Sequence, residues 1–312
     1  MLNKLNFMKK TILNFFLFAC FIGFTANISA QDYRFGIRGG LSFSQLLGPQ
    51  INNADYSEAY SLNNGIHFGV TLAYHLTDNF GFRTEVAYNQ IGTRYVFESD
   101  NAPYVFRFAL DREVRRGAII RELDINNAYI HVPIMTFFKP HKKIELYGGI
   151  YTQFLVLPTA GGSIDFTDLN PTGNIEDGDL KNFSFFQTVE ANYYSDQPRQ
   201  STSTQGLTVS LLIDNEIERI NMARGVGGYF ELDADEVLAT KYNWFDAGLE
   251  GGFSYFVNGS LYFSLTAMYG LIDVTNDPAD VDFFELNEFN KAVFRDDYDR
   301  NFSLQLSMGF KF

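Results

Sequence analysis

Hydrophobic and polar residues alternate with a period of two at eight places along the chain. The last twelve residues show the pattern most clearly: every second residue from Phe302 to Phe312 is apolar, and every second residue from Asn301 to Lys311 is polar or small. A period of two places the two sets on opposite faces of a β-strand. The pattern predicts strands over residues 33–43, 66–76, 79–89, 128–139, 143–156, 244–257, 260–272 and 301–312.

The connections between these strands alternate between short and long. Tight turns are expected at 77–79, 140–143 and 258–260, whereas long loops are expected at 48–65, 98–122, 158–243 and 273–300. Transmembrane barrels sort their connections in this way, with short periplasmic turns and long extracellular loops. The sequence therefore predicts an all-β, up-and-down antiparallel transmembrane barrel of eight strands, integral to the bacterial outer membrane.

The two faces of the strands differ in a way that assigns the apolar face to lipid. The apolar faces carry large Phe, Leu, Tyr and Ile side chains, while the opposite faces carry Gly and Ser with a few charges. The lumen of eight strands is only wide enough for side chains, so small residues and a few charges fit it better than rows of Phe. Strands of this length, rising about 3.3 Å per residue and tilted by about 40°, cross roughly 25–30 Å.

Composition agrees with a β protein and argues against a nucleic-acid partner. Aromatic residues make up 17 % of the chain, with 33 Phe and 18 Tyr, and these residues favour strands. The net charge is −13, and no basic stripe is present, whereas nucleic-acid binding needs clustered Lys and Arg. Acidic runs at 175–179, 231–236 and 295–299 are expected to be solvated loops.

The N-terminus has the features of a secretory signal peptide. Lys9 and Lys10 precede an apolar stretch from Ile12 to Phe24, and small residues precede an expected cleavage after Ala30. We therefore divide the chain into a signal peptide at 1–30 and a barrel domain at 31–312. The single cysteine, Cys20, lies within the signal peptide, so the mature chain would have none.

Among the charged residues on the polar faces of the strands, seven are candidates for a charge network in the lumen. They are Arg34, Arg38, Arg83, Glu85, Glu145, Glu250 and Lys311. Counted from the short turns, Arg38, Glu85 and Glu250 should lie near the middle of the lumen, with Arg34, Glu145 and Lys311 nearer the periplasm. Buried charges must be paired or hydrated, so we expect a salt-bridged plug; a proton or ion path is the alternative.

The sequence offers no catalytic, cofactor-binding or metal-binding residue to assign. His67 and His75 are roughly 26 Å apart along one strand and cannot share a metal. A hydrolytic set at the outer rim, for instance His67 with a loop serine, is not supported by spacing, since triads are recognised by geometry. We expect a protein that is not an enzyme and has no cofactor.

The segment at about 158–243 is the longest connection in the chain and is expected to be an extracellular insertion. Within it, 184–194 is interpreted as a short helix and 206–213 as a strand or hairpin. Residues 104–110 are interpreted as an extension of the preceding strand. An added strand pair would make a barrel of ten strands.

Two stretches resemble the PorT-like outer-membrane β-barrel family of the Bacteroidota. Residues 128–156 are similar to that family's Pro-containing strand, basic turn and Gly-rich strand, and 268–277 resembles its penultimate strand and Asn/Asp loop. The resemblance implies the barrel fold and supplies no catalytic residues. Some members assist type IX secretion, and this chain fits the broad family better than that component.

The expected partners follow from this fold. Met308, Phe310 and Phe312 resemble the aromatic end by which the barrel-assembly machinery recognises its clients, although Ser307 stands where that signal often has Gly. Outer-membrane lipid and lipopolysaccharide should surround the barrel, and a protein partner is expected at the extracellular insertion. The expected function is a structural, adhesion-like or accessory role; the alternatives are a narrow channel and a lipid-A-type hydrolase.

Overall fold

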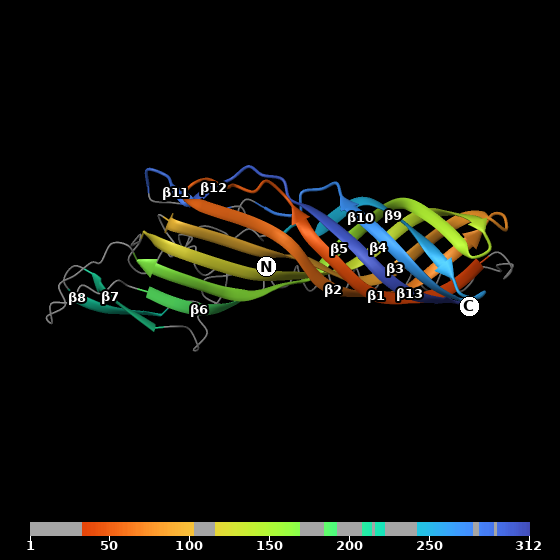
Figure 1. Cartoon of the computed structure of the whole chain (residues 1–312), viewed down its shortest axis with the longest axis horizontal. Helices are drawn as coiled ribbons and strands as arrows, with labels where there is room; N and C mark the ends of the chain where they lie inside the picture. The colour runs from red at the N-terminus through yellow and green to blue at the C-terminus, as the bar shows by residue number, and fades with distance from the viewer. Residues whose placement is uncertain are drawn as a thin grey trace, which may run out of the picture.

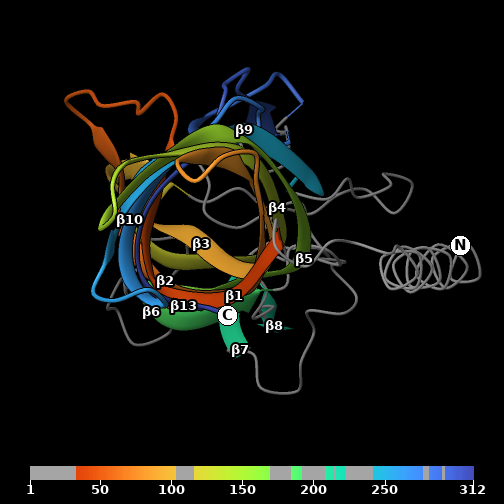
Figure 2. The same cartoon turned by 90° about the vertical axis from the view of Figure 1, so that its right-hand side faces the viewer.

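The computed structural model describes residues 33–102, 116–168, 184–191, 208–213, 216–221, 242–276, 281–289 and 292–312. Eight long strands form a closed antiparallel ring, and closure comes from the pairing of the first strand with the last (Figures 1 and 2). The ring strands are β1 (Tyr33–Leu47), β2 (Tyr56–His75), β3 (Phe80–Ala102), β4 (Gly117–His141), β5 (Ile144–Asp168), β9 (Phe245–Phe256), β10 (Leu261–Gly270) and β13 (Arg300–Lys311).

The order around the ring follows the order along the chain, as expected for an up-and-down barrel. The sheet runs β4-β3-β2-β1-β13-β10-β9-β5, and β5 pairs with β4 to complete the circle. Over the residues at which all eight strands lie side by side, closure leaves no unpaired edge. The predicted fold of eight strands is therefore confirmed, and no added pair enlarges the ring to ten.

Three short turns lie at one end of the barrel, where the C-terminus also lies (Figure 1). They join β2 to β3, β4 to β5 and β9 to β10, as the sequence predicts. Side chains stabilise them locally: Asn258 Oδ1 accepts hydrogen bonds from the amides of Ser260 and Leu261, and Thr77 Oγ1 accepts one from the amide of Phe80.

At the opposite end, four strands continue far beyond their predicted limits. β2 begins at Tyr56, β3 ends at Ala102, β4 begins at Gly117 and β5 ends at Asp168. Parts of what the sequence presented as the loops 48–65, 98–122 and 158–243 are thus strand, and the four strands project beyond the ring as one curved sheet, to the left in Figure 1.

Further strands accompany this projecting sheet. β6 (Ser184–Ala191) pairs with the outer part of β5, so the short helix predicted at 184–194 is wrong. The strand expected at 206–213 is confirmed as β7 (Thr208–Ile213), which forms a hairpin with β8 (Glu216–Asn221). β11 (Val281–Leu286) pairs with β12 (Ala292–Phe294). Residues 104–110 and the signal peptide lie outside the described residues.

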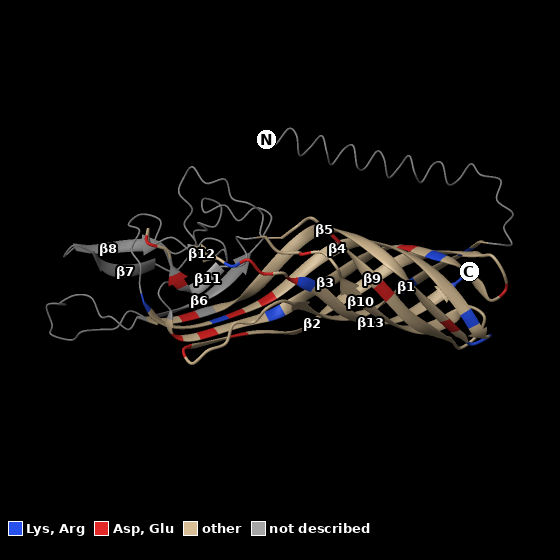
Figure 3. Cartoon of the chain, turned by 90° about the horizontal axis from the view of Figure 1, so that it is seen from above, with Lys and Arg blue, Asp and Glu red and all other residues tan. Residues whose placement is uncertain are grey.

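The barrel wall has an apolar outer face and a polar, buried inner face. Phe35, Leu41, Ile134, Leu306 and Met308 are among the outward side chains that are half-exposed. The ribbon of the ring is mostly uncharged, with isolated charged positions, while charges gather on the projecting sheet (Figure 3). No helix in the described part of the chain has the length and apolar character of a membrane span.

Large aromatic rings also occupy the lumen, which differs from the sequence-based expectation. Tyr262 and Tyr151 are 0 % and 1 % exposed on the inner face. Each ring lies over a glycine of a neighbouring strand: a Cβ at Gly309 would overlap the ring of Tyr262, and one at Gly248 would lie 2.8 Å from the hydroxyl of Tyr151. Glycines therefore provide the space that single aromatic rings need in the lumen. The rows of Phe on the strands face outward, as expected, and do not enter the lumen.

Candidate functional site: the charged lumen

Arg38 is the centre of a charged cluster at mid-depth in the lumen. It comes from β1, and its cross-strand neighbours in register are Gly69 of β2 and Gly309 of β13. With no side chain on either flank, the long guanidinium group reaches across the lumen. Its side chain is 1 % exposed, so water does not reach it.

Two carboxylates and a hydroxyl surround the Arg38 guanidinium. Nε lies 2.6 and 2.9 Å from the two carboxylate oxygens of Glu85 on β3, and Nη2 lies 3.6 Å from Glu250 on β9. Nη1 donates to Thr266 Oγ1 at 3.2 Å. Glu250 is joined in turn to His131 Nε2 at 2.8 Å. The strands β1, β3, β9 and β10 are thereby connected through one side chain.

A second charged cluster lies nearer the short turns. Glu145 accepts from Lys311 Nζ at 2.8 Å and from Arg83 Nη1 at 3.1 Å, and Lys139 Nζ is 3.6 Å away. The Arg83 guanidinium carbon lies 3.9 Å from the centroid of the Tyr147 ring, a cation–π contact. This cluster ties β13, the last strand, to β3 and β5.

Six of the seven charged residues singled out in the sequence enter these clusters. Arg38, Arg83, Glu85, Glu145, Glu250 and Lys311 are each at most 4 % exposed, and together they carry three positive and three negative charges. Arg34 differs, because it lies at the short-turn mouth of β1, is exposed and so stands apart from the buried clusters.

His67 also lies in the lumen, between two strand serines. Its Nδ1 is 3.2 Å from Ser42 Oγ and its Nε2 is 2.7 Å from Ser307 Oγ, and it is 2 % exposed. A hydrolytic triad needs a carboxylate on one ring nitrogen and an accessible nucleophile on the other. Both nitrogens of His67 instead meet buried hydroxyls, so the arrangement considered for a hydrolase is not formed here.

Sequence reasoning missed a third polar group nearer the long-loop end. Asp246 is fully buried, and its Oδ2 accepts from Gln153 Nε2 at 2.6 Å, Asn301 Nδ2 at 2.9 Å and Tyr151 Oη at 3.4 Å. The alternation on β9 placed Asp246 on the polar face, but its partners are neutral and carry no charge pattern. Counting opposite charges could not have found this group.

Sequence reasoning also missed an ion pair at the outer rim. Arg295 donates to both carboxylate oxygens of Glu58, at 2.7 and 2.9 Å, and the Tyr95 hydroxyl donates to the same carboxylate at 3.1 Å. The run 295–299 was expected to be a solvated acidic loop. Instead its first residue is bound to β2 and its last, Asp299, is 1 % exposed.

Asp299 occupies a crowded acidic position at this rim. Its Oδ2 accepts from the Thr275 hydroxyl at 3.3 Å, and its amide donates to Asp273 Oδ1 at 3.1 Å. Burial and the neighbouring charge of Asp297 raise the pKa of Asp299 to about 7. Among the described residues, no group of three or more His, Cys, Asp or Glu side chains is arranged to hold a metal ion.

Met308, Phe310 and Phe312 lie on the outward face of the last strand. Phe312 is 71 % exposed, and its amide donates to the carbonyl of Phe35 at 2.8 Å, so the terminal residue pairs with the first strand. The last strand is thus also the seam that closes the ring.

Several solved outer-membrane barrels are similar to this chain over most of their length. Ail, the attachment invasion locus protein of Yersinia pestis, is 11 % identical with a TM-score of 0.32, over 90 % of this chain and 100 % of that one. OprG of Pseudomonas aeruginosa is 13 % identical with a TM-score of 0.35, over 90 % and 96 %. Neisserial surface protein A is 12 % identical with a TM-score of 0.33, over 89 % and 97 %.

Sequence comparison identifies the family. A search of curated proteins found no match. The family model described as outer membrane protein beta-barrel domain matches residues 29–276, which is well over half of the chain. Together with the closed ring of eight strands, this match shows that the chain belongs to the outer-membrane β-barrel family and is an integral protein of the outer membrane.

Proposed function

We propose that this protein is a non-enzymatic outer-membrane barrel with a closed lumen, which acts through the sheet and loops at its long-loop end. One observation carries the proposal: six charged side chains form two ion-paired clusters in the lumen and are at most 4 % exposed. A lumen filled in this way has no continuous water path at that depth. The part of the molecule left for interaction is the projecting sheet.

The orientation follows from the connections. Barrels of this kind keep short turns on the periplasmic side and long loops outside, so the projecting sheet would face the exterior. Residues 1–30 would direct export as a signal peptide. The hairpin of β4 and β5, with its basic turn at Lys142 and Lys143, supports a finer placement in the PorT-like group of the Bacteroidota.

Conductance across a planar bilayer tests the closed lumen. We expect the purified, folded protein to give no single-channel steps. Arg38→Ala should also stay silent, because Tyr147 and Tyr262 still fill the lumen beside it. Regular steps in the wild type, with an ion selectivity that changes in Arg38→Ala, would instead favour the narrow channel, for which the contiguous Glu85, Arg38, Glu250 and His131 would provide the path.

Cysteine labelling on intact cells tests the orientation. The expected mature chain has no cysteine, so single cysteines can be introduced without background. Glu98→Cys, on the exposed face of the projecting part of β3, should react with an impermeant maleimide on intact cells. Gly259→Cys, in a short turn, should react only after the outer membrane is permeabilised. The opposite result would reverse the proposed orientation.

Crosslinking from the same surface tests the interaction role. A photo-crosslinking residue at position 98 in living cells should trap a neighbour that one at position 259 does not. The class of partner is then read from the trapped product, which separates an adhesion-like role from an accessory role in an envelope complex. Absence of any adduct specific to position 98 would count against a protein partner on this face.

A further inference from the structure

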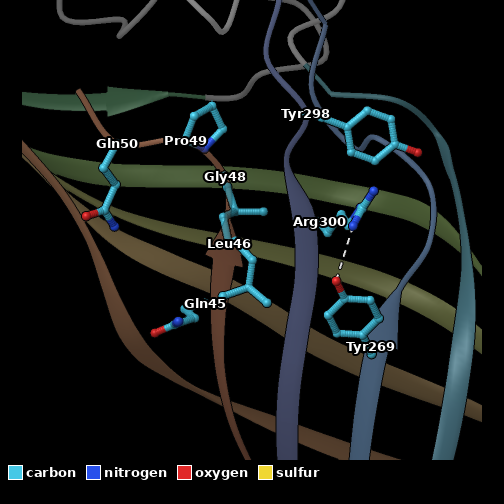
Figure 4. A pocket seen from close by; sticks show the side chains of 9 residues that line it. Gln45, Leu46, Gly48, Pro49, Gln50, Tyr269, Tyr298 and Arg300 are labelled. Carbon is cyan, nitrogen blue, oxygen red and sulfur yellow. Dashed lines mark hydrogen bonds between the residues drawn. The ribbon is translucent and has the colours of Figure 1, made fainter.

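An open hollow of about 340 Å³ lies on the outer wall of the barrel at its long-loop end. One side is the end of β1 and the turn after it, from Gln45 to Gln50, and the other carries Tyr269, Tyr298 and Arg300 (Figure 4). The strands that supply it, β1, β13 and β10, are neighbours in the sheet. Tyr269 and Tyr298 are 38 % and 45 % exposed, and Tyr269 lies on the outward face of β10, so the hollow opens on the outer surface of the barrel.

Arg300 is held in this hollow by two tyrosines. Its Nη1 donates to the Tyr269 hydroxyl at 3.2 Å, and its guanidinium carbon lies 4.5 Å from the centroid of the Tyr298 ring. The Tyr298 hydroxyl is fixed in turn, since it donates to the carbonyl of Leu271 at 2.8 Å. The guanidinium is thus oriented before any ligand arrives, with further N–H donors unused.

No ion pair joins Arg300 to a carboxylate in the part of the chain that the structure describes. The side chain of its neighbour Asp299 points to the interior, where it accepts a hydrogen bond from the Thr275 hydroxyl. The buried arginines of the lumen each contact a glutamate, so Arg300 differs from them in lacking a local counter-charge. A fixed cation of this kind is suited to an external anion.

The hollow also marks the level at which the outer wall changes from apolar to polar. Arg300 shares its strand face with Leu304 and Leu306, Tyr269 shares its face with Phe263, and Gln45 shares its face with Leu41. Tyrosine and arginine at the edge of an apolar band lie at the depth of lipid headgroups. The anion that meets Arg300 would therefore come from the bilayer.

We propose that this hollow binds a phosphate group of a phosphorylated outer-leaflet glycolipid, the lipid A part of lipopolysaccharide. The remaining guanidinium donors would take the phosphate oxygens, and the Gln45 and Gln50 amides line the opposite side. The acyl chains would lie along the apolar wall below, beside Leu41 and Leu306. The choice of the outer leaflet rests on the proposed orientation of the barrel.

Native mass spectrometry of the detergent-solubilised protein tests the site. Wild type, Arg300→Gln and Lys142→Gln would be titrated with bisphosphorylated lipid A, with its fully dephosphorylated form and with inorganic phosphate. Lys142→Gln is the matched control, since it removes the same charge from an exposed turn at the other end of the barrel. We expect Arg300→Gln to bind bisphosphorylated lipid A about tenfold more weakly, and Lys142→Gln to bind as wild type does.

Each other outcome overturns a stated part of the proposal. Equal binding by wild type and Arg300→Gln, or equal losses in both variants, would remove the site. Equal affinity for dephosphorylated lipid A would remove phosphate recognition. Saturation by inorganic phosphate alone, at the affinity of the lipid, would make the hollow a site for a free anion.

Two further measurements keep the result interpretable. Tyr269→Phe removes only the hydrogen bond that orients Arg300 and should weaken lipid binding by about threefold, less than Arg300→Gln does. Each variant should keep the gel mobility of the folded barrel before heating, so a loss of binding is not a loss of fold. A micelle has no inner or outer leaflet, so failure here is distinct from failure of the orientation test by cysteine labelling.

Discussion

At the scale of single residues, the lumen shows how charges can be buried inside a narrow barrel. An isolated buried charge is very costly, and its cost is offset only by close partners with good geometry. Arg38 meets two glutamates, and Glu145 meets two cations at hydrogen-bond distance. The six charges balance, so each removal should leave an uncompensated partner in place.

We expect Arg38→Ala to destabilise the barrel by about 3–5 kcal/mol, because Glu85 and Glu250 would then face each other without a cation. Arg94→Ala is the matched control: Arg94 pairs with Glu122 on the exposed face, where such pairs contribute about 0–1 kcal/mol. The measurement is the temperature at which the folded band is lost on gels run after stepwise heating. Equal midpoints for the two variants would show that the lumen pairing adds no stability.

Glycine is required in the lumen where an aromatic ring lies over it. A Cβ at Gly309 would overlap the Tyr262 ring, whereas one at Gly259 would meet nothing within 4 Å. We expect Gly309→Ala to cost about 1–3 kcal/mol through overpacking, and Gly259→Ala to be close to neutral. The same heating series checks both, and Tyr262→Ala should suppress the effect of Gly309→Ala. If the double variant is no better than the sum of the two single variants, the ring is not the cause.

At the scale of elements, the sequence predicts the strands well within the bilayer and less well beyond it. The segments at which apolar residues face outward were predicted closely, because lipid outside and charges inside give a sharp alternation. On the outer part of β4 the two faces exchange their character. Ile119, Leu123 and Ile125 are buried on the inner face, while Glu122 and Asp124 face outward. The period of two persists there, and only the assignment of the faces had to be reversed to extend the strand.

The contacts within the lumen are harder to predict from the sequence than the face of the strand on which each residue lies. The alternation of side chains along a strand predicts that Glu85 and Glu250 point inward. Their pairing with Arg38 depends on strand register around the whole ring. That register is the combined result of several strand pairings, such as Arg38 with Gly69 and Thr71 with Glu85, and one sequence carries no clear signal for it. Faces follow from local pattern, whereas contacts across the lumen do not.

The rim segment before β13 should respond to pH. The pKa of Asp299 is raised by burial and by Asp297 from 3.8 to about 7, so the folded protein binds this proton more tightly than the unfolded chain does. The free energy of unfolding should then fall as the pH rises from about 4 to 7, and be constant above that range as far as this group is concerned. The rim is thus expected to be held more firmly at pH 5.5 than at pH 8.

Asp299→Asn removes the titrating group and should abolish this part of the pH dependence. At pH 8 the variant should be more stable than wild type by about 2 kcal/mol, and at pH 5.5 by about half as much, because the unfolded chain has already lost this proton at that pH. Thermal unfolding followed by circular dichroism at the two pH values measures both. A wild type that is more stable at pH 8, or a variant that keeps the full pH dependence, would show that Asp299 does not titrate in this range.

At the scale of the whole molecule, the barrel and the segment after β5 are separable in their pairing. β5 pairs with β9 from Ile144 to Phe154, and the ring closes through β1 and β13. Of the described residues between Asp168 and Tyr242, only β6 pairs with a ring strand, and it does so on the outer part of β5, beyond the β5–β9 pairing. The β5–β9 register therefore needs the two strands to be connected, but it does not depend on which residues connect them.

This separation predicts that residues 169–241 can be replaced by a linker without loss of the barrel. β5 continues for fourteen residues beyond Phe154, where it parts from β9. At about 3.3 Å per residue the return path is roughly 46 Å, so a Gly/Ser linker of about 20 residues is long enough when extended. The variant should keep its heat-modifiable gel mobility, with a midpoint within a few degrees of wild type, and should lose crosslinks that depend on the removed segment.

A linker of about 5 residues cannot span that path and is the matched control, since it should separate the outer part of β5 from β4. Loss of the folded band with the long linker would show that the replaced segment is required to build the ring.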